Sequence, residues 1–292
     1  MKPTYRQVRQ LIPARAVSEG AGVRLFRSLG QSAGTRLDPF LMLDEFVSDN
    51  PNDYIAGFPS HPHRGFETVT YMLHGHMLHE DHMGNSGHLR AGDVQWMTAG
   101  RGIIHSEMPQ QQEGLMHGFQ LWINLPGKEK MTPAFYRDAA ASEIPKHEVC
   151  QGVSIRHIAG TAHYLPSGEE STGFFNGLDQ RPRSSDPLFL DISLSPGSQC
   201  EIRFASEHQA FCYVYQGKAE IGEHSIPKRH AANLSEGETC LIKSQTETRV
   251  LLLAGKPFLE PIAQYGPFVM NTVDEIDQAL RDYRDGRLTE SS

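Results

Sequence analysis

Apolar and polar residues alternate with a period of two along most of the chain. The alternation is clear from Glu67 to Leu73, and the stretch PLFLDISL (187–194) places four aliphatic side chains on one face: Leu188, Leu190, Ile192 and Leu194. A period of two is typical of β-strands, because successive side chains point to opposite faces of the sheet. The 18 prolines and 27 glycines are scattered between such runs. The pattern therefore predicts many short strands joined by turns, that is, an all-β chain.

Helical periodicity is convincing only near the C-terminus. Thr272 and Glu275 have the spacing of a capping box, in which each residue caps the first turn of a helix. Apolar residues then recur at helical spacing: Val273, Ile276, Leu280 and Tyr283. Gly286 follows as a stop signal. The pattern predicts a C-terminal amphipathic helix that packs on a β-domain.

A weak internal repeat predicts two related β-domains. Gly75 of ETVTYMLHG aligns with Gly217 of QAFCYVYQG, and Gly92 of LRAGD aligns with Gly237 of LSEGE. We place the domains at 1–138 and 139–292, joined near the alanine-rich stretch 137–145, which predicts a short linker helix.

Composition limits the classes of function. The 292 residues carry a formal charge of −8, and no cluster of basic and aromatic residues suggests direct nucleic-acid binding. The four cysteines lack C-x-x-C spacing, which indicates reduced thiols. The N-terminal residues have no apolar leader, and no apolar run approaches the ~18 residues of a membrane span. A soluble cytoplasmic protein is expected.

Histidine is the unusual feature, because nine of the 15 histidines lie between positions 61 and 117. His61 and His63 are two residues apart at the start of HPHRGFETVTY, and His105 and Glu107 are two apart in GRGIIHSEM. In a strand, residues i and i+2 share one face at about 6.5–7 Å along the chain. Two neighbouring strands that each carry such a pair can therefore bring four ligands to one ion.

Three imidazoles and one carboxylate suit a divalent first-row metal: Fe, Mn, Ni, Cu, Co or Zn. Four protein ligands leave up to two octahedral positions for substrate or dioxygen. The absence of thiolate ligands argues against a closed structural zinc site. The repeat predicts a single site, because its register places other residues opposite the four candidates: Arg203, Ala205, Val250 and Leu252.

Other candidate ligands lie nearby. His79 and His82 lie with Glu80 and Asp81 in the hairpin HGHMLHEDHMGNSGH, and the stretch 83–87 has the composition of a turn. We interpret these residues as a polar hairpin tip, with a metal-binding loop as the alternative. Glu67 is four residues beyond His63 and would share its face on a continuous strand. It is predicted either to bind the metal or to orient a histidine.

Two long stretches resemble the sequence motifs of cupins. The segment from Gly57 to Gly75 resembles the first cupin motif, and GDVQWMTAGRGIIH (92–105) resembles the second. Thr98 replaces the usual proline, and the loop before His105 is longer than in the general pattern. These departures are typical of the pirin family, and the C-terminal stretch GPFVMNTVDEIDQALRDYRDGRL also resembles pirin sequences. The resemblance covers nearly the whole chain.

The resemblance implies two cupin, jelly-roll-type β-barrels with a C-terminal helix. It also implies one metal, usually iron, in the N-terminal barrel and a degenerate C-terminal barrel. Matching the motifs places the metal ligands at His61, His63, His105 and Glu107, and leaves Glu67 to orient them.

Many pirins are quercetin 2,3-dioxygenases, so a planar flavonol and dioxygen are the expected substrates. A carboxylate near the metal must accept the proton of the flavonol 3-hydroxyl. Glu107 is the first candidate for this base and Glu67 the second. The resemblance also implies an alternative, because eukaryotic pirins act as iron-dependent transcriptional coregulators that bind a protein partner. A non-oxidative cupin is a third possibility, and a monomer is expected from the family.

Overall fold

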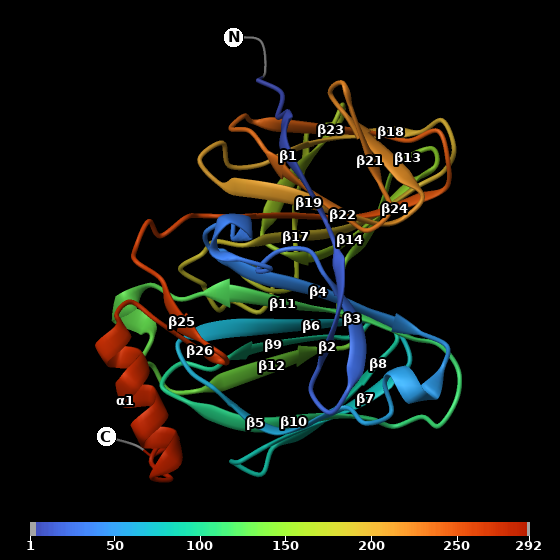
Figure 1. Cartoon of the computed structure of the whole chain (residues 1–292). Coiled ribbons are helices and arrows are strands. Elements are labelled where there is room, and N and C mark those ends of the chain that lie inside the picture. Colours follow the sequence, from blue (N-terminus) through green and yellow to red (C-terminus); the bar gives the residue numbers. More distant parts are fainter. Residues whose placement is uncertain (1–3, 291–292) are drawn as a thin grey trace. The chain divides into compact units, whose positions relative to one another are not determined.

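The structure of the protein is a computed structural model that describes residues 4–290. It divides into two compact units, each of which combines three stretches of the chain (Figure 1). The N-barrel unit contains Ala16–Arg27, Phe40–Ala141 and Phe258–Ser292. The C-barrel unit contains Met1–Arg15, Ser28–Pro39 and Ser142–Pro257. The units therefore differ from contiguous halves divided at 138/139, because the two ends of the chain belong to opposite units.

The N-barrel unit contains two main antiparallel sheets and a two-stranded one, and the four ligands expected from the motifs lie in the smaller of the two main sheets. The larger sheet has the order β12 (Phe135–Ala139), β9 (Val94–Thr98), β6 (Phe66–His74), β11 (Met116–Asn124), β4 (Phe40–Ser48), β3 (Val23–Arg27) and β2 (Arg15–Glu19). The smaller sheet has the order β5 (Phe58–His63), β10 (Ile103–Pro109), β7 (His76–Asp81) and β8 (Ser86–Arg90).

The C-barrel unit repeats this arrangement with added strands. Its larger sheet has the order β1 (Val8–Pro13), β22 (His230–Leu234), β19 (Gln209–Gln216), β24 (Thr248–Gly255), β17 (Leu188–Leu194), β14 (Val153–Ala159) and β13 (Lys146–Cys150). Its smaller sheet has the order β16 (Glu169–Thr172), β15 (Thr161–Leu165), β18 (Gln199–Arg203), β23 (Thr239–Lys243), β20 (Lys218–Ile221) and β21 (His224–Pro227). The mostly-β fold expected from the alternating pattern is confirmed for residues 4–290.

The C-terminal helix α1 (Val273–Arg284) has the predicted capping box. The Thr272 hydroxyl accepts a hydrogen bond from the Glu275 amide, and the Glu275 carboxylate accepts one from the Thr272 amide. The helix packs beside the hairpin of β25 (Ala263–Tyr265) and β26 (Phe268–Met270) in the N-barrel unit (Figure 1). Ile276 and Ala279 are its buried residues, whereas Val273 is 70% exposed. Within residues 4–290, no helix is long and apolar enough to cross a membrane.

Two details of the sequence prediction are wrong. The predicted linker helix is absent from 137–145, where β12 ends at Ala139 and a turn follows. The downstream half of the repeat is shifted by one strand, because Gly92 precedes β9 whereas Gly237 precedes β23. By position in the sheets, the counterpart of β9 is β22, which pairs with β19 as β9 pairs with β6. The strand equivalent to β10 is therefore β23, so Val250 is not the counterpart of His105.

The two barrels have different interiors. In the C-barrel unit, β18 and β23 contribute Cys200, Ile202, Cys240 and Ile242 to a large apolar core. Burial raises the pKa of both thiols, which favours their protonated form. In the N-barrel unit, the equivalent strands β5 and β10 carry histidines. The expectation that the second copy lacks the ligands therefore agrees with the residues found at these positions.

Candidate metal centre

The paired positions of the sequence motif lie on adjacent strands. Strand β5 pairs with β10 in antiparallel register, which places His105 directly opposite His61 and Ile103 opposite His63. The register shifts between His105 and Glu107, and this irregularity places Glu107 opposite Phe58. Because alternate residues of a strand share a face, His61, His63 and His105 project into the same space.

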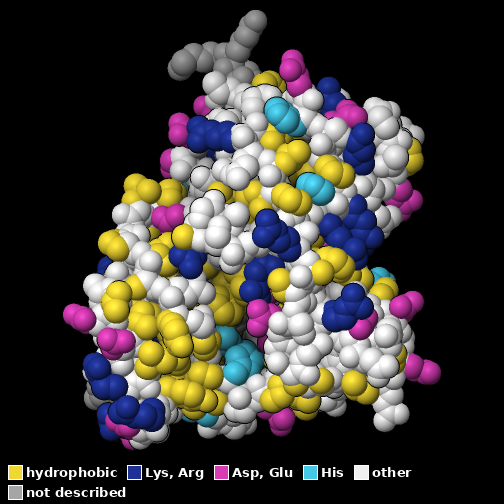
Figure 2. All heavy atoms as spheres, in the orientation of Figure 1, with side chains coloured by type: hydrophobic (Ala, Val, Ile, Leu, Met, Phe, Trp, Pro, Cys, Tyr) yellow, Lys and Arg dark blue, Asp and Glu magenta, His cyan; other side chains and the backbone are white. Residues whose placement is uncertain are grey.

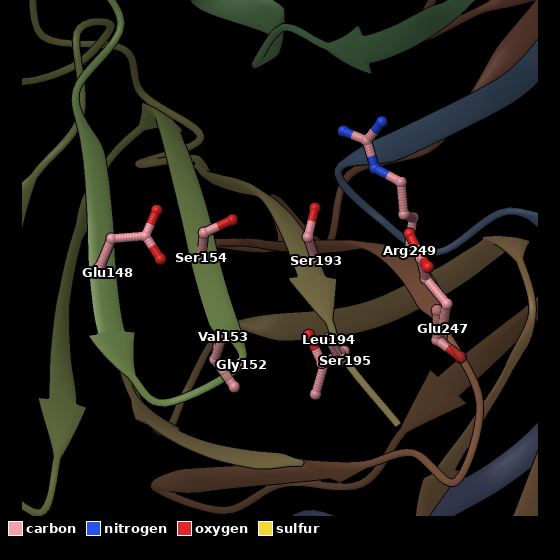
Figure 3. A pocket seen from close by; sticks show the side chains of 10 residues that line it. Glu148, Gly152, Val153, Ser154, Ser193, Leu194, Ser195, Glu247 and Arg249 are labelled. Carbon is pink, nitrogen blue, oxygen red and sulfur yellow. The ribbon is translucent and has the colours of Figure 1, made fainter. Parts of the chain in front are cut away.

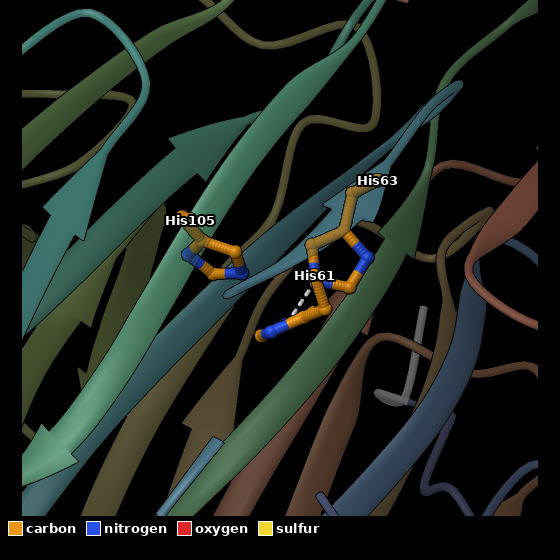
Figure 4. Close-up of side chains that lie close together, drawn as sticks. All are labelled: His61, His63 and His105. Carbon is orange, nitrogen blue, oxygen red and sulfur yellow. Dashed lines mark hydrogen bonds between the residues drawn. The ribbon is translucent and has the colours of Figure 1, made fainter. Parts of the chain in front are cut away.

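The three histidines form a compact cluster. One ring nitrogen of each lies within 4.8 Å of the others, and no further carboxylate or thiol of residues 4–290 meets this condition with all three. The Nε2 atoms of His61 and His63 are 3.0 Å apart. The ring centroid of His105 lies 4.4 Å from that of His61 and 4.9 Å from that of His63. In Figure 4 the three rings, from β5 and β10, point toward one another.

These imidazoles are suited to bind a cation. Burial, with the neighbouring imidazoles, holds the pKa of His63 and His105 well below the usual range, so both are neutral. His61 Nδ1 lies 2.8 Å from the carbonyl oxygen of Pro59; if it donates there, Nε2 carries the lone pair. His105 Nε2 is buried and has no hydrogen-bond partner among the described residues. A divalent metal would occupy these lone pairs, so the donor set fits the expected ion.

His79, which the sequence offered only as an alternative ligand, is a fourth histidine at this site. It is fully buried on β7, opposite Glu107 in the register with β10. Its Nδ1 atom lies 3.3 Å from Nδ1 of His105. The interpretation as a polar hairpin tip is therefore wrong for His79. Alternation did not reveal its burial, because Met77 and Leu78 are both apolar and each face of β7 therefore carries one apolar residue.

Glu107 faces the interior but is not a member of the histidine triangle. Its side chain is buried, with Oε1 3.1 Å from the Thr70 hydroxyl and Oε2 3.3 Å from the Gln120 amide nitrogen. Burial raises the pKa of Glu107 to about 7, although the contacts with Thr70 and Gln120 lower it. The structure thus places a carboxyl group next to the histidines and holds it with two polar side chains of the larger sheet.

Glu67 lies on the other face of its strand. Strand β5 ends at His63, and Gly65, with φ +90°, turns the chain before β6 begins at Phe66. The Phe66 ring lies 5.1 Å from the His63 ring, so the next residue, Glu67, points to the opposite face. Its carboxylate accepts a hydrogen bond of 2.7 Å from the Thr98 hydroxyl. The expectation that Glu67 shares the face of His63 therefore fails.

Aromatic side chains border the histidines. The Trp122 ring lies 5.4 Å from the His63 ring and 4.3 Å from the Phe66 ring, and Tyr136 lies 5.6 Å from His79. Trp122 and Tyr136 are only partly buried. On one face of the molecule, histidine side chains are visible in a hollow bordered by hydrophobic side chains (Figure 2). The interior thus combines polar groups with flat aromatic surfaces.

A second hollow, of about 280 Å³, lies at one end of the larger sheet of the C-barrel unit (Figure 3). Serines and charged side chains line it, among them Ser154, Ser193, Glu148 and Arg249. No histidine or cysteine is part of its lining. Its composition offers no alternative to the histidine cluster as a metal site.

Two family models match the chain. The model described as Pirin matches residues 22–123, and the model described as Pirin C-terminal cupin domain matches residues 189–289. The first match contains all four histidines of the site together with Glu107. The second match lies mostly in the barrel with the apolar interior.

Proteins of known name are similar over nearly the whole chain. A Pseudomonas aeruginosa protein named "Putative quercetin 2,3-dioxygenase" is 52% identical, over 97% of this chain and 98% of that protein. Human Pirin is 40% identical, over 97% and 93% respectively. A crystal structure of quercetin 2,3-dioxygenase from Acinetobacter baumannii has a TM-score of 0.87 and 32% identity, over 97% of this chain and 98% of that one.

Proposed function

Because the chain belongs to the pirin family, we propose that it is a metal-dependent dioxygenase that opens the ring of a flavonol such as quercetin. The observation that carries this proposal is the convergence of three neutral imidazoles beside a buried carboxyl group. The names of the similar Pseudomonas and Acinetobacter proteins support the substrate class.

We assign the metal to His61, His63 and His105, with Glu107 as a proposed fourth ligand. The proposed ion is iron, and a bound divalent transition metal supplies Lewis acidity and coordination positions for dioxygen chemistry. Burial lowers the pKa of all three imidazoles, so protons compete less for their lone pairs. Gln120 and Thr70 hold the Glu107 carboxyl group in the barrel interior.

The remaining residues bind and prepare the substrate. A flavonol is planar, and the partly exposed ring of Trp122, with Phe66 behind it, offers a flat surface beside His63. Glu107 is the proposed base that accepts the proton of the 3-hydroxyl, since it is the carboxyl group on the same strand as His105. In the overall reaction both atoms of dioxygen enter the organic product and one carbon leaves as carbon monoxide.

The activity is tested by oxygen uptake with quercetin, using protein reconstituted separately with Fe²⁺, Mn²⁺, Ni²⁺, Co²⁺, Cu²⁺ and Zn²⁺. We expect uptake with equimolar carbon monoxide release for at least one redox-active metal. Flavone, which lacks the 3-hydroxyl, is the control substrate and should not react. Failure of every metal form to consume oxygen would contradict the enzymatic proposal and favour the regulatory alternative, in which the metal controls binding to a protein partner.

The role of Glu107 as base gives a second expected result. Glu107→Gln should reduce turnover of quercetin by about 10²- to 10⁴-fold, the range for loss of a general base. Because Glu107 is also the proposed fourth ligand, turnover is compared at metal concentrations that saturate each variant. Glu80→Gln is the matched control, since Glu80 is the exposed neighbour of His79 on β7. Turnover of Glu107→Gln close to that of the wild type, with metal bound, would exclude Glu107 as the base.

A further inference from the structure

Arg64 directly follows the histidine pair and is almost completely buried, at 3% exposure. Its guanidinium donates to three acceptors in two other segments of the N-barrel unit. Nη1 donates to Asp282 on α1 at 2.7 Å, Nη2 donates to the Leu288 carbonyl at 3.1 Å, and Nε donates to the Arg101 carbonyl. One side chain therefore joins the end of β5, the loop before β10 and the C-terminal segment.

The backbone around Arg64 makes further contacts with the C-terminal hairpin. The Val269 amide donates to the Arg64 carbonyl at 3.0 Å, and the Arg64 amide donates to the Pro267 carbonyl at 3.3 Å. A Cβ atom at Gly65 would collide with the Val269 carbonyl oxygen, so the chains approach as closely as glycine allows. The turn that ends the His63 strand is thus fixed against residues 267–269.

The loop before His105 is held by the same C-terminal segment. A Cβ atom at Gly102 would collide with the Leu288 carbonyl oxygen. Ile104, adjacent to His105, packs against a cluster formed by α1 and its surroundings: Phe268, Met270, Ile276, Ala279 and Leu288. Both strands that supply histidines therefore contact residues that follow position 266.

We propose that Arg64 is a positioning residue for the metal centre, through which the C-terminal segment sets the separation of His63 and His105 and hence the metal affinity. This inference rests on the proposed metal binding and is independent of the dioxygenase activity. Arginine suits the role, because its planar fork can bond two carbonyls and a carboxylate at once. Lysine presents a single ammonium group in place of the planar guanidinium, so we expect it to lose part of this set of bonds.

The test is titration of the metal-free protein with Co²⁺ alone, following the absorption spectrum of the bound ion. Loss of groups that orient metal ligands weakens metal binding by about 10- to 100-fold. We expect Arg64→Lys and Asp282→Asn to raise the dissociation constant within this range and to change the Co²⁺ spectrum. Asp282→Glu, which keeps the ion pair, should recover much of the affinity.

Asp285→Asn is the matched control, because Asp285 follows α1 and pairs with Arg284 and Arg287 without touching Arg64. It should bind Co²⁺ like the wild type. Wild-type affinity and spectrum in folded Asp282→Asn, as judged by circular dichroism, would overturn the proposal. Absence of Co²⁺ binding by the wild type would also overturn it, whereas Co²⁺ binding without quercetin turnover would contradict only the proposed reaction.

Discussion

His105→Ala is expected to lose the bound metal and the turnover of quercetin together. His105 is the only member of the triangle supplied by β10, and without it the two remaining imidazoles come from one short strand. Loss of residues that merely orient a ligand costs about 10- to 100-fold in metal affinity, so loss of a ligand should exceed that range. Metal per chain, measured by mass spectrometry of the purified variant, should fall from about one to near zero.

His88→Ala is the control for this variant. His88 lies on β8 of the same small sheet, and its ring is exposed and contacts His76 at 2.8 Å. Its removal takes away a histidine without affecting the cluster, so metal content and turnover should not change. Undiminished metal in His105→Ala would mean that the ion binds elsewhere, and the assignment of the triangle as the metal centre would be incorrect.

The histidine pairs were predictable because the spacing of two residues is a local property of a strand. The sequence shows His61 and His63 two apart and His105 followed two later by Glu107, and the structure places both pairs on adjacent strands. The C-terminal helix was predictable for the same reason, since Thr272 and Glu275 cap it locally. The burial of His79 was not predictable in this way, because Met77 and Leu78 place one apolar residue on each face of β7.

Other features depend on contacts between distant residues and carry no local signal. The pairing of β1 with β22 joins segments more than 200 residues apart, so the exchange of the chain ends between the units could not be inferred from periodicity. The orientation of Glu67 differs from the expectation because Gly65 interrupts the strand between His63 and Phe66 and changes which residues face the interior. The conformation of Gly65 in turn depends on Val269, far along the chain.

Lys130→Met should strongly destabilise the N-barrel unit. Lys130 is 1% exposed, and its ammonium group donates to the Gly65 carbonyl at 2.8 Å, the Asn124 side-chain oxygen at 2.7 Å and the Val269 carbonyl at 3.0 Å. Methionine keeps the apolar part of the side chain, but it cannot donate a hydrogen bond to these three buried acceptors. An unsatisfied buried acceptor costs about 1–3 kcal/mol, and removal of a desolvated charge offsets part of the total. We expect a net loss of about 3 kcal/mol in the free energy of unfolding.

Thermal denaturation of the metal-free protein measures this loss, with Lys128→Met as the control. Lys128 is two residues away and 80% exposed, and its nearest carboxylate is 3.8 Å distant, so its replacement should leave the midpoint unchanged. At roughly 2–4 °C per kcal/mol, the Lys130 variant should melt about 6–12 °C lower. Equal melting temperatures for the two variants would show that the Lys130 ammonium group does not contribute to the stability of the fold. Because Lys130 bonds both Gly65 and Val269, its loss should also weaken the contact between the C-terminal hairpin and the turn after His63, and so should lower metal affinity in the same direction as Arg64→Lys.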